Sequence, residues 1–193
     1  MVCSPRPSGT RSRVAAAIAA GTLLAAACGG ASSGEGETQF GAERAVEVDG
    51  GVCSLLSTGE VETLTGRDME AGVQTVGANC DWKLSDNDLG DGVGVTVEVD
   101  PLTVFGGTTE AYELFLRESF GTLIPVPELG ENVWATVPAE VSDDVNGISA
   151  VRGDNVVSLS ALFLDAAPDS AEFDAMVDTM GLVLTRLDEK LPS

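Results

Sequence analysis

The reactive side chains of this 193-residue sequence are few: it has four cysteines and no histidine. Without an imidazole, the chain has no Ser-His-Asp or Cys-His nucleophile and no histidine-ligated zinc or haem site. Only Lys83 and Lys190 offer an amine, and no context singles out a catalytic pair among the 31 acidic residues. We therefore expect no catalytic residue, no cofactor and no metal site, and a hydrolase using carboxylate or serine chemistry is the alternative.

Cys28 ends a segment with the features of a secretory signal peptide. Arg6, Arg11 and Arg13 precede an uncharged run over 14–27, and the last three residues before Cys28 are alanines. As a helix this run would span about 21 Å, less than the ~30 Å of a bilayer core, so a permanent membrane span is disfavoured.

The alanines followed by Cys28 resemble the bacterial lipobox, in which the cysteine is diacylated and becomes the first residue of the mature protein. The leucine usual three positions earlier is replaced by Ala25, and Leu24 stands one position further back. We expect residues 1–27 to be a lipoprotein signal peptide, Cys28 the lipidation site, and the cell membrane the location, on its extracytoplasmic face. An ordinary secretory signal that happens to contain a cysteine is the alternative.

Residues 28–50 are expected to be the lipidated cysteine and a flexible acidic tether, because glycine, serine and glutamate dominate and no periodicity is present. The whole chain has 31 acidic and 10 basic residues, a net charge of −21 and a pI of about 4.1. This balance disfavours nucleic acid and anionic lipid as electrostatic partners. The hydrophobic fraction of 44% indicates a folded chain, and we expect a single domain over 51–193.

Three helices are expected in that domain. Ser57 and Glu60 form a capping box ahead of a short helix that Gly66 ends. A second helix is expected over 109–120 with Gly121 closing it. Asp169 and Glu172 form the expected capping box of the last helix, whose apolar stripe is predicted to be core. The stripe comprises Phe173, Met176, Val177, Met180, Leu184 and Leu187.

Six segments alternate apolar and polar residues or are bounded by turn residues, as strands do. They are 73–76, 79–84, 93–99, 132–137, 147–151 and 156–164. Because sequential strands are joined by short turns, the sequence predicts an α+β domain. Its sheet would be mostly antiparallel, with about five or six strands and with helices packed on one face.

Cys53 and Cys80 are the two cysteines left after Cys3 is removed with the signal and Cys28 is lipidated. Outside the cytoplasm they are expected to form a single disulfide. Cys80 and Trp82 are two residues apart on a predicted strand, so the indole can cover the bridge. A redox-active pair is the alternative, although such pairs usually show Cys-x-x-Cys spacing.

Several segments, in order, resemble a family of actinobacterial cell-envelope lipoproteins of unknown function (Domain of Unknown Function 3558-like). They are Cys53-Ser54-Leu55-Leu56-Ser57, Cys80-Asp81-Trp82, Leu129-Gly130-Glu131 and the stretch 151–157. Glu131 stands where aspartate is usual. The resemblance covers nearly the whole domain and implies a surface-anchored, disulfide-stapled domain with no catalytic residue established.

Two further motifs have simpler interpretations. The acidic stretch 86–92 resembles a calcium loop, but its glycine is at the fifth position and Val97 stands at the twelfth, so we favour a hairpin turn. Arg152-Gly153-Asp154 spells a cell-adhesion tripeptide, and we likewise interpret it as a hairpin turn.

The leading hypothesis is a non-catalytic, membrane-anchored lipoprotein that binds an unidentified ligand or protein of the cell envelope. The membrane, through the lipid, is the other expected partner. A purely structural or regulatory partner without a pocket is a further alternative to the hydrolase. A cleft lined by apolar groups with a few converging polar ones would favour ligand binding.

Overall fold

The computed structural model describes residues 46–75, 78–85, 93–138, 144–161, 164 and 166–191. The lipidation site Cys28, the predicted signal peptide and the loop 86–92 lie outside these residues. The helices are α1 (Thr58–Thr65), α2 (Thr109–Phe120) and α3 (Ala171–Lys190), with short 3-10 helices η1 (Val52–Ser54), η3 (Leu102–Phe105) and η4 (Pro127–Leu129). The strands are β1 (Val73–Gln74), β2 (Asn79–Lys83), β3 (Val93–Pro101), β4 (Gly121–Pro125), β5 (Val133–Pro138), β6 (Gly147–Arg152) and β7 (Asn155–Ala161).

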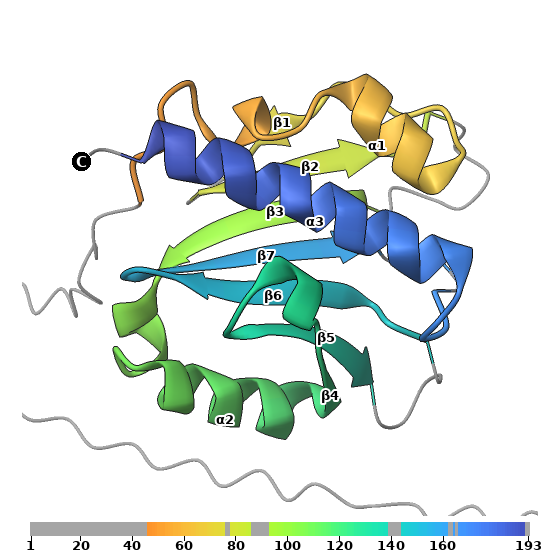
Figure 1. Ribbon diagram of the computed structural model, residues 1–193. Coiled ribbons are helices and arrows are strands. Elements are labelled where there is room, and N and C mark those ends of the chain that lie inside the picture. The colour runs from red at the N-terminus through yellow and green to blue at the C-terminus, as the bar shows by residue number, and fades with distance from the viewer. Residues whose placement is uncertain are drawn as a thin grey trace, which may run out of the picture. The chain divides into compact units, whose positions relative to one another are not determined.

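The seven strands form one sheet in the order β1-β2-β3-β7-β6-β5-β4, and every neighbouring pair is antiparallel (Figure 1). The α+β prediction is confirmed, with more strands than the five or six expected. The strand that the sequence analysis missed is β4. It follows α2 without a loop, because Gly121, with φ +90°, ends the helix and begins the strand at once.

One face of the sheet carries the main core. Strand β3, next to the central strand β7, turns Val95, Val97 and Val99 toward this core, and all three are fully buried. Helix α3 lies across this face, over β3, β7 and β6 (Figure 1). The predicted stripe of α3 is buried as expected, at Phe173, Met176, Val177, Met180, Leu184 and Leu187.

Helix α2 covers the opposite face, so the helices do not all pack on one face as the sequence suggested. The Tyr112 hydroxyl lies 3.4 Å from the Ser158 hydroxyl. Ser158 alternates on β7 with Val157 and Leu159, which belong to the main core, so it points to the other side of the sheet. A second apolar cluster lies between α2 and this face: Leu102, Tyr112, Leu116, Leu123, Trp134, Val151 and Val156.

Two boundaries differ from the predicted ones. Helix α3 is capped by Ser170, whose Oγ accepts a hydrogen bond of 3.1 Å from the Phe173 N–H; Asp169, expected at the cap, instead takes φ +69°. The folded domain also begins before residue 51. Val48 is buried in the main core, and the Asp49 N–H donates to the Lys190 carbonyl at the end of α3. The part of the chain expected to be tether is therefore shorter than 28–50.

Candidate binding cleft

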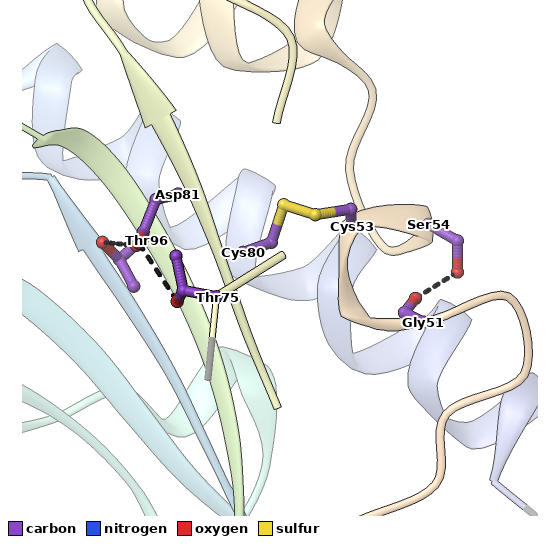
Figure 2. The surroundings of a disulfide bond; sticks show 7 residues. All are labelled: Gly51, Cys53, Ser54, Thr75, Cys80, Asp81 and Thr96. Carbon is purple, nitrogen blue, oxygen red and sulfur yellow. Dashed lines mark hydrogen bonds between the residues drawn. A yellow bond between two sulfur atoms is a disulfide. The ribbon is translucent and has the colours of Figure 1, made fainter. Parts of the chain in front are cut away.

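The predicted disulfide is present: Cys53 in η1 is bonded to Cys80 in β2 (Figure 2). The two cysteines are 27 residues apart, so the bridge is expected to stabilise the fold by about 3.5 kcal/mol through loop closure. Trp82 and Cys80 both approach Gly72, where an added Cβ would lie 2.6 Å from the indole and 2.7 Å from the Cys80 sulfur. The predicted packing of Trp82 beside the bridge is confirmed, and this corner of the domain is structural.

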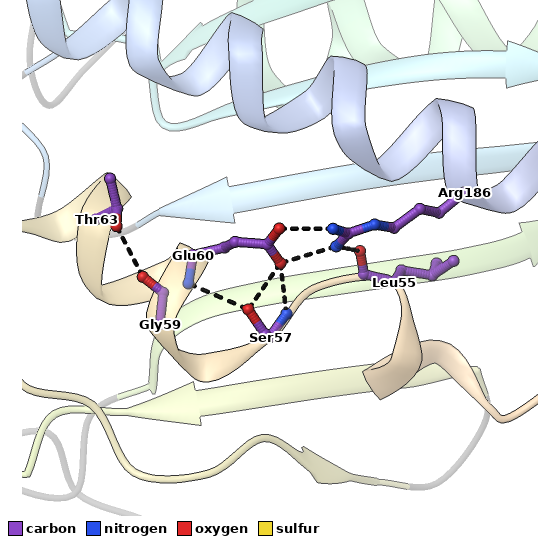
Figure 3. A network of polar contacts seen from close by, with 6 residues as sticks. All are labelled: Leu55, Ser57, Gly59, Glu60, Thr63 and Arg186. Carbon is purple, nitrogen blue, oxygen red and sulfur yellow. Dashed lines mark hydrogen bonds and ion pairs between the residues drawn. The ribbon is translucent and has the colours of Figure 1, made fainter.

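Glu60, at the start of α1, is the centre of a polar network. Its carboxylate accepts hydrogen bonds from the Ser57 N–H and hydroxyl, each of 2.8 Å, which completes the predicted capping box (Figure 3). The same carboxylate accepts two hydrogen bonds, of 2.6 and 2.8 Å, from Arg186 of α3. The guanidinium of Arg186 and the Ser57 backbone lower the pKa of Glu60 to about 2. This network joins α1 to α3 and is also structural.

The Arg152-Gly153-Asp154 segment forms the hairpin turn between β6 and β7, as predicted. Gly153 has φ +57°, the left-handed conformation that such turns need. Arg152 donates a 2.6 Å hydrogen bond to the Leu129 carbonyl. The Arg152 guanidinium is therefore engaged in a hydrogen bond within the domain.

A cleft of about 290 Å³ lies between α2 and the face of the sheet that α2 partly covers. The register of the sheet explains its polar floor. Ser158 of β7 is paired with Glu98 of β3 on one side and with Ser149 of β6 on the other. The neighbouring row pairs Ser160 with Thr96 and with Gly147. The floor residues that line the cleft are Glu98, Asp100, Thr136, Ser149, Ser158 and Ser160.

Aromatic rings from η3 and α2 form the wall of the cleft. The ring centroid of Phe105 lies 4.8 Å from that of Tyr112 and 5.0 Å from that of Phe115. Tyr112 is buried, whereas Phe115 is 40% exposed. The 3.6-residue period of α2 brings Tyr112, Phe115 and Leu116 onto the side that lines the cleft.

Polar atoms converge at the bottom of the cleft. The Tyr112 hydroxyl contacts the Ser158 hydroxyl, which lies 3.0 Å from the Ser149 hydroxyl. Burial raises the pKa of Tyr112, so the phenol is retained as a neutral hydrogen-bonding group. The three hydroxyls form a chain that can donate to or accept from a bound molecule.

Two carboxyl groups, Glu98 and Asp100, stand side by side on the β3 part of the floor. They are two residues apart on one strand and therefore share a face. Burial is the main cause that raises the pKa of each, and the charge of Asp100 raises the pKa of Glu98 further. Beyond them on the same face, Asp81 accepts a 2.9 Å hydrogen bond from Thr96 (Figure 2).

Within the described ranges, no group of three cysteine or acidic side chains gathers closely enough to hold a metal ion. None of the described helices has the length and apolar character to cross a membrane. Comparisons of the chain with protein-family models, with curated proteins and with solved structures find no match.

The sequence analysis did not identify Glu98, Asp100, Ser158 or Tyr112 as site residues. A signal was present, because the polar positions of two predicted strands hold Thr96, Glu98 and Asp100, and Ser158 and Ser160. What the sequence did not indicate was that these strands are neighbours and that α2 lies over them.

Proposed function

We propose that this protein is a lipid-anchored, extracytoplasmic binding protein that holds a small ligand in the cleft beneath α2. The observation that carries the proposal is the cleft itself. Its volume of about 290 Å³ is close to the lower end of the range for small-molecule sites. It also has the composition typical of such sites, an aromatic wall facing a few convergent polar groups.

The anchor is supported by the sequence of residues 1–28 alone. The basic segment, the uncharged run and the small residues before the cleavage point match a secretory signal, and the alanines before Cys28 resemble a lipobox apart from Ala25 in place of the usual leucine. The disulfide between Cys53 and Cys80 agrees with a location outside the cytoplasm, because such bonds persist in oxidising compartments.

A hydrolase is the second candidate, because Glu98 and Asp100 place two carboxyl groups in the cleft. The two side chains lie on the same face of one strand, and burial raises the pKa of both, as suits a carboxyl group that must stay protonated to act as an acid.

The anchor is tested by Cys28→Ser. The wild-type protein is expected to enter the detergent phase after extraction of membranes, and the variant is expected to leave the membrane fraction or to stay unprocessed. If the variant is processed and still enters the detergent phase as the wild type does, the lipid anchor is rejected.

Ligand binding is tested by native mass spectrometry of the protein purified from the envelope of the cells that produce it. We expect a bound small molecule, which Ser160→Phe should remove by filling the cleft. Thr185→Phe, at an exposed site on α3, is the matched control and should retain the molecule. No bound mass in any form, or an equal bound mass in Ser160→Phe, would contradict the binding function.

A further inference from the structure

We propose that the cleft beneath α2 takes a small organic cation, with its ammonium group against Glu98 and Asp100 and its apolar body against the aromatic wall. This inference rests on the proposed function, since it names the class of ligand for the same cleft.

The charges around the cleft provide the first argument. Two carboxyl groups line it, and no lysine or arginine does so in the part of the chain that the structure describes. An anionic ligand would therefore be repelled, because a pocket lined by one sign of charge attracts the opposite sign.

Several basic residues of the described domain are engaged or lie away from the cleft. Arg117 pairs with Glu113 on α2 itself, at 2.6 Å. Arg152 donates to the Leu129 carbonyl, and Lys190 donates to Ser54 on the domain's other side. Lys83 is exposed at the end of β2 and does not line the cleft. Among the residues that the structure describes, no cation therefore lines the cleft to neutralise the carboxyl pair.

The lack of a cation among the described residues lining the cleft matters because the two carboxyl groups are partly removed from water. Glu98 and Asp100 are half-buried on the floor of the cleft. Burial raises the pKa of both carboxyl groups, and the charge of Asp100 raises the pKa of Glu98 further. An ammonium group placed between them would relieve the repulsion and replace lost water contacts. A neutral ligand could donate a hydrogen bond but would not relieve the repulsion between the two charges.

The aromatic wall provides the second argument. Ammonium groups are attracted to the faces of aromatic rings within about 6 Å, most strongly where water is excluded. Phe105, Tyr112 and Phe115 form one contiguous group of rings beside the carboxyl pair. The rings also offer an apolar surface to the body of the ligand, and the volume of about 290 Å³ limits that body to a small molecule.

The test compares three probes of nearly equal size: phenethylammonium, the neutral 2-phenylethanol and the anion phenylacetate. Dissociation constants are measured by NMR titration of the purified protein at pH 7 and 0.15 M salt. We expect phenethylammonium to bind at least 10-fold more tightly than 2-phenylethanol and to shift resonances of the floor and α2. Phenylacetate is expected to bind most weakly.

A double variant, Glu98→Gln with Asp100→Asn, should abolish the preference for the cation. This variant is expected to fold, because it removes a repulsion, and its melting curve verifies that. Asp178→Asn with Asp188→Asn is the matched control, which removes the same charge from exposed sites on α3, across the sheet. The control should keep the preference.

The outcomes separate this inference from the function on which it rests. Equal affinities for phenethylammonium and 2-phenylethanol, or an equal loss in the control variant, overturn the cation class. The binding function would stand in that case if Ser160→Phe still removes the molecule that copurifies. If phenethylammonium does not bind at all, the cation class is likewise rejected. The binding function itself is rejected only by the copurification experiment, if no bound mass is found in any form or if Ser160→Phe retains an equal bound mass.

Discussion

A single carboxylate, that of Glu60, caps α1 and also fixes α1 to α3. It accepts hydrogen bonds from Ser57 of its own capping box and from Arg186, 126 residues further along the chain. The sequence predicted the first role, because the capping box is a local pattern with fixed spacing. It did not predict the second, because no local rule links residues so far apart.

The pKa of Glu60 sets a pH dependence that can be measured. Because the folded-state pKa is about 2, below the usual value of 4.5, ionised Glu60 stabilises the fold above pH 4.5 and loses this contribution as the pH falls toward 2. The side chain is 29% exposed, so solvent screening reduces the effect to about 1–2 kcal/mol. Glu60→Gln should therefore lower the free energy of unfolding by that amount at pH 7.

The check is urea unfolding of both proteins between pH 7 and pH 2.5. The difference between wild type and Glu60→Gln should shrink steadily below pH 4.5. Glu70→Gln, at an exposed site, is the control and should change stability little. A difference that stays constant down to pH 2.5 would reject the role of the ionised carboxylate.

At the level of secondary structure, the sequence predicted the individual helices and strands better than their arrangement in the fold. Capping boxes, helix-ending glycines and strand alternation are local signals, so α1, α2, β2, β3, β5 and β6 were placed within two residues. Strand β7 ends at Ala161, three residues before the predicted end. Strand β4 was missed because Gly121 was interpreted only as the end of a helix. The face covered by α2 was missed because both faces of β5, β6 and β7 hold apolar residues, and periodicity does not say which helix covers which face.

The same limit explains why the cleft was not foreseen. Its floor comes from β3, β5, β6 and β7, and its wall comes from η3 and α2. Each strand contributes polar residues at positions that alone indicate only a solvated face. The cleft forms because the register of the sheet brings these polar residues side by side and because α2 lies next to them.

The packing of Gly72 against β2 gives a prediction at this scale. A methyl group at this position would lie 2.6 Å from the Trp82 ring and 2.7 Å from the Cys80 sulfur, and neither can move freely because the ring is buried and the sulfur is bridged. Gly72→Ala should therefore destabilise the fold by about 1–3 kcal/mol. Thermal unfolding followed by circular dichroism should show a melting temperature several degrees lower.

Gly59→Ala is the matched control, because nothing lies within 4 Å of the added methyl group and the residue is in α1. It should stabilise the protein by up to about 1 kcal/mol, since glycine is unfavourable in a helix. If Gly72→Ala melts at or above the wild-type temperature, the close contact with Trp82 and Cys80 is not present in solution.

At the scale of the whole molecule, the dominant property is charge. The chain has 31 acidic and 10 basic residues, and removing the predicted signal would leave 7 − 31 = −24. The ion pairs Arg117–Glu113 and Arg186–Glu60 engage only a small part of the acidic groups. The remaining acidic groups repel one another, and folding brings them closer together, so the repulsion opposes the compact state.

This repulsion predicts that salt stabilises the protein. The Debye length falls from ~10 Å at 0.1 M salt to ~3 Å at 1 M, so exposed carboxylates interact less strongly as salt is added. Screening also weakens the two ion pairs, but each contributes only about 1 kcal/mol or less when exposed. The melting temperature at pH 7 should therefore rise as sodium chloride is increased from 0.02 M to 1 M, with most of the gain at the lower concentrations.

The control is the same salt series close to the pI of about 4.1, where the net charge is near zero and the repulsion is largely absent. There the gain should be much smaller than at pH 7. An equal gain at both pH values would mean that salt acts on apolar surface rather than on charge, because that effect does not depend on the ionisation of carboxylates. Magnesium chloride or calcium chloride at matched ionic strength should add little, and a saturable gain with one of these ions alone would indicate a specific cation site instead.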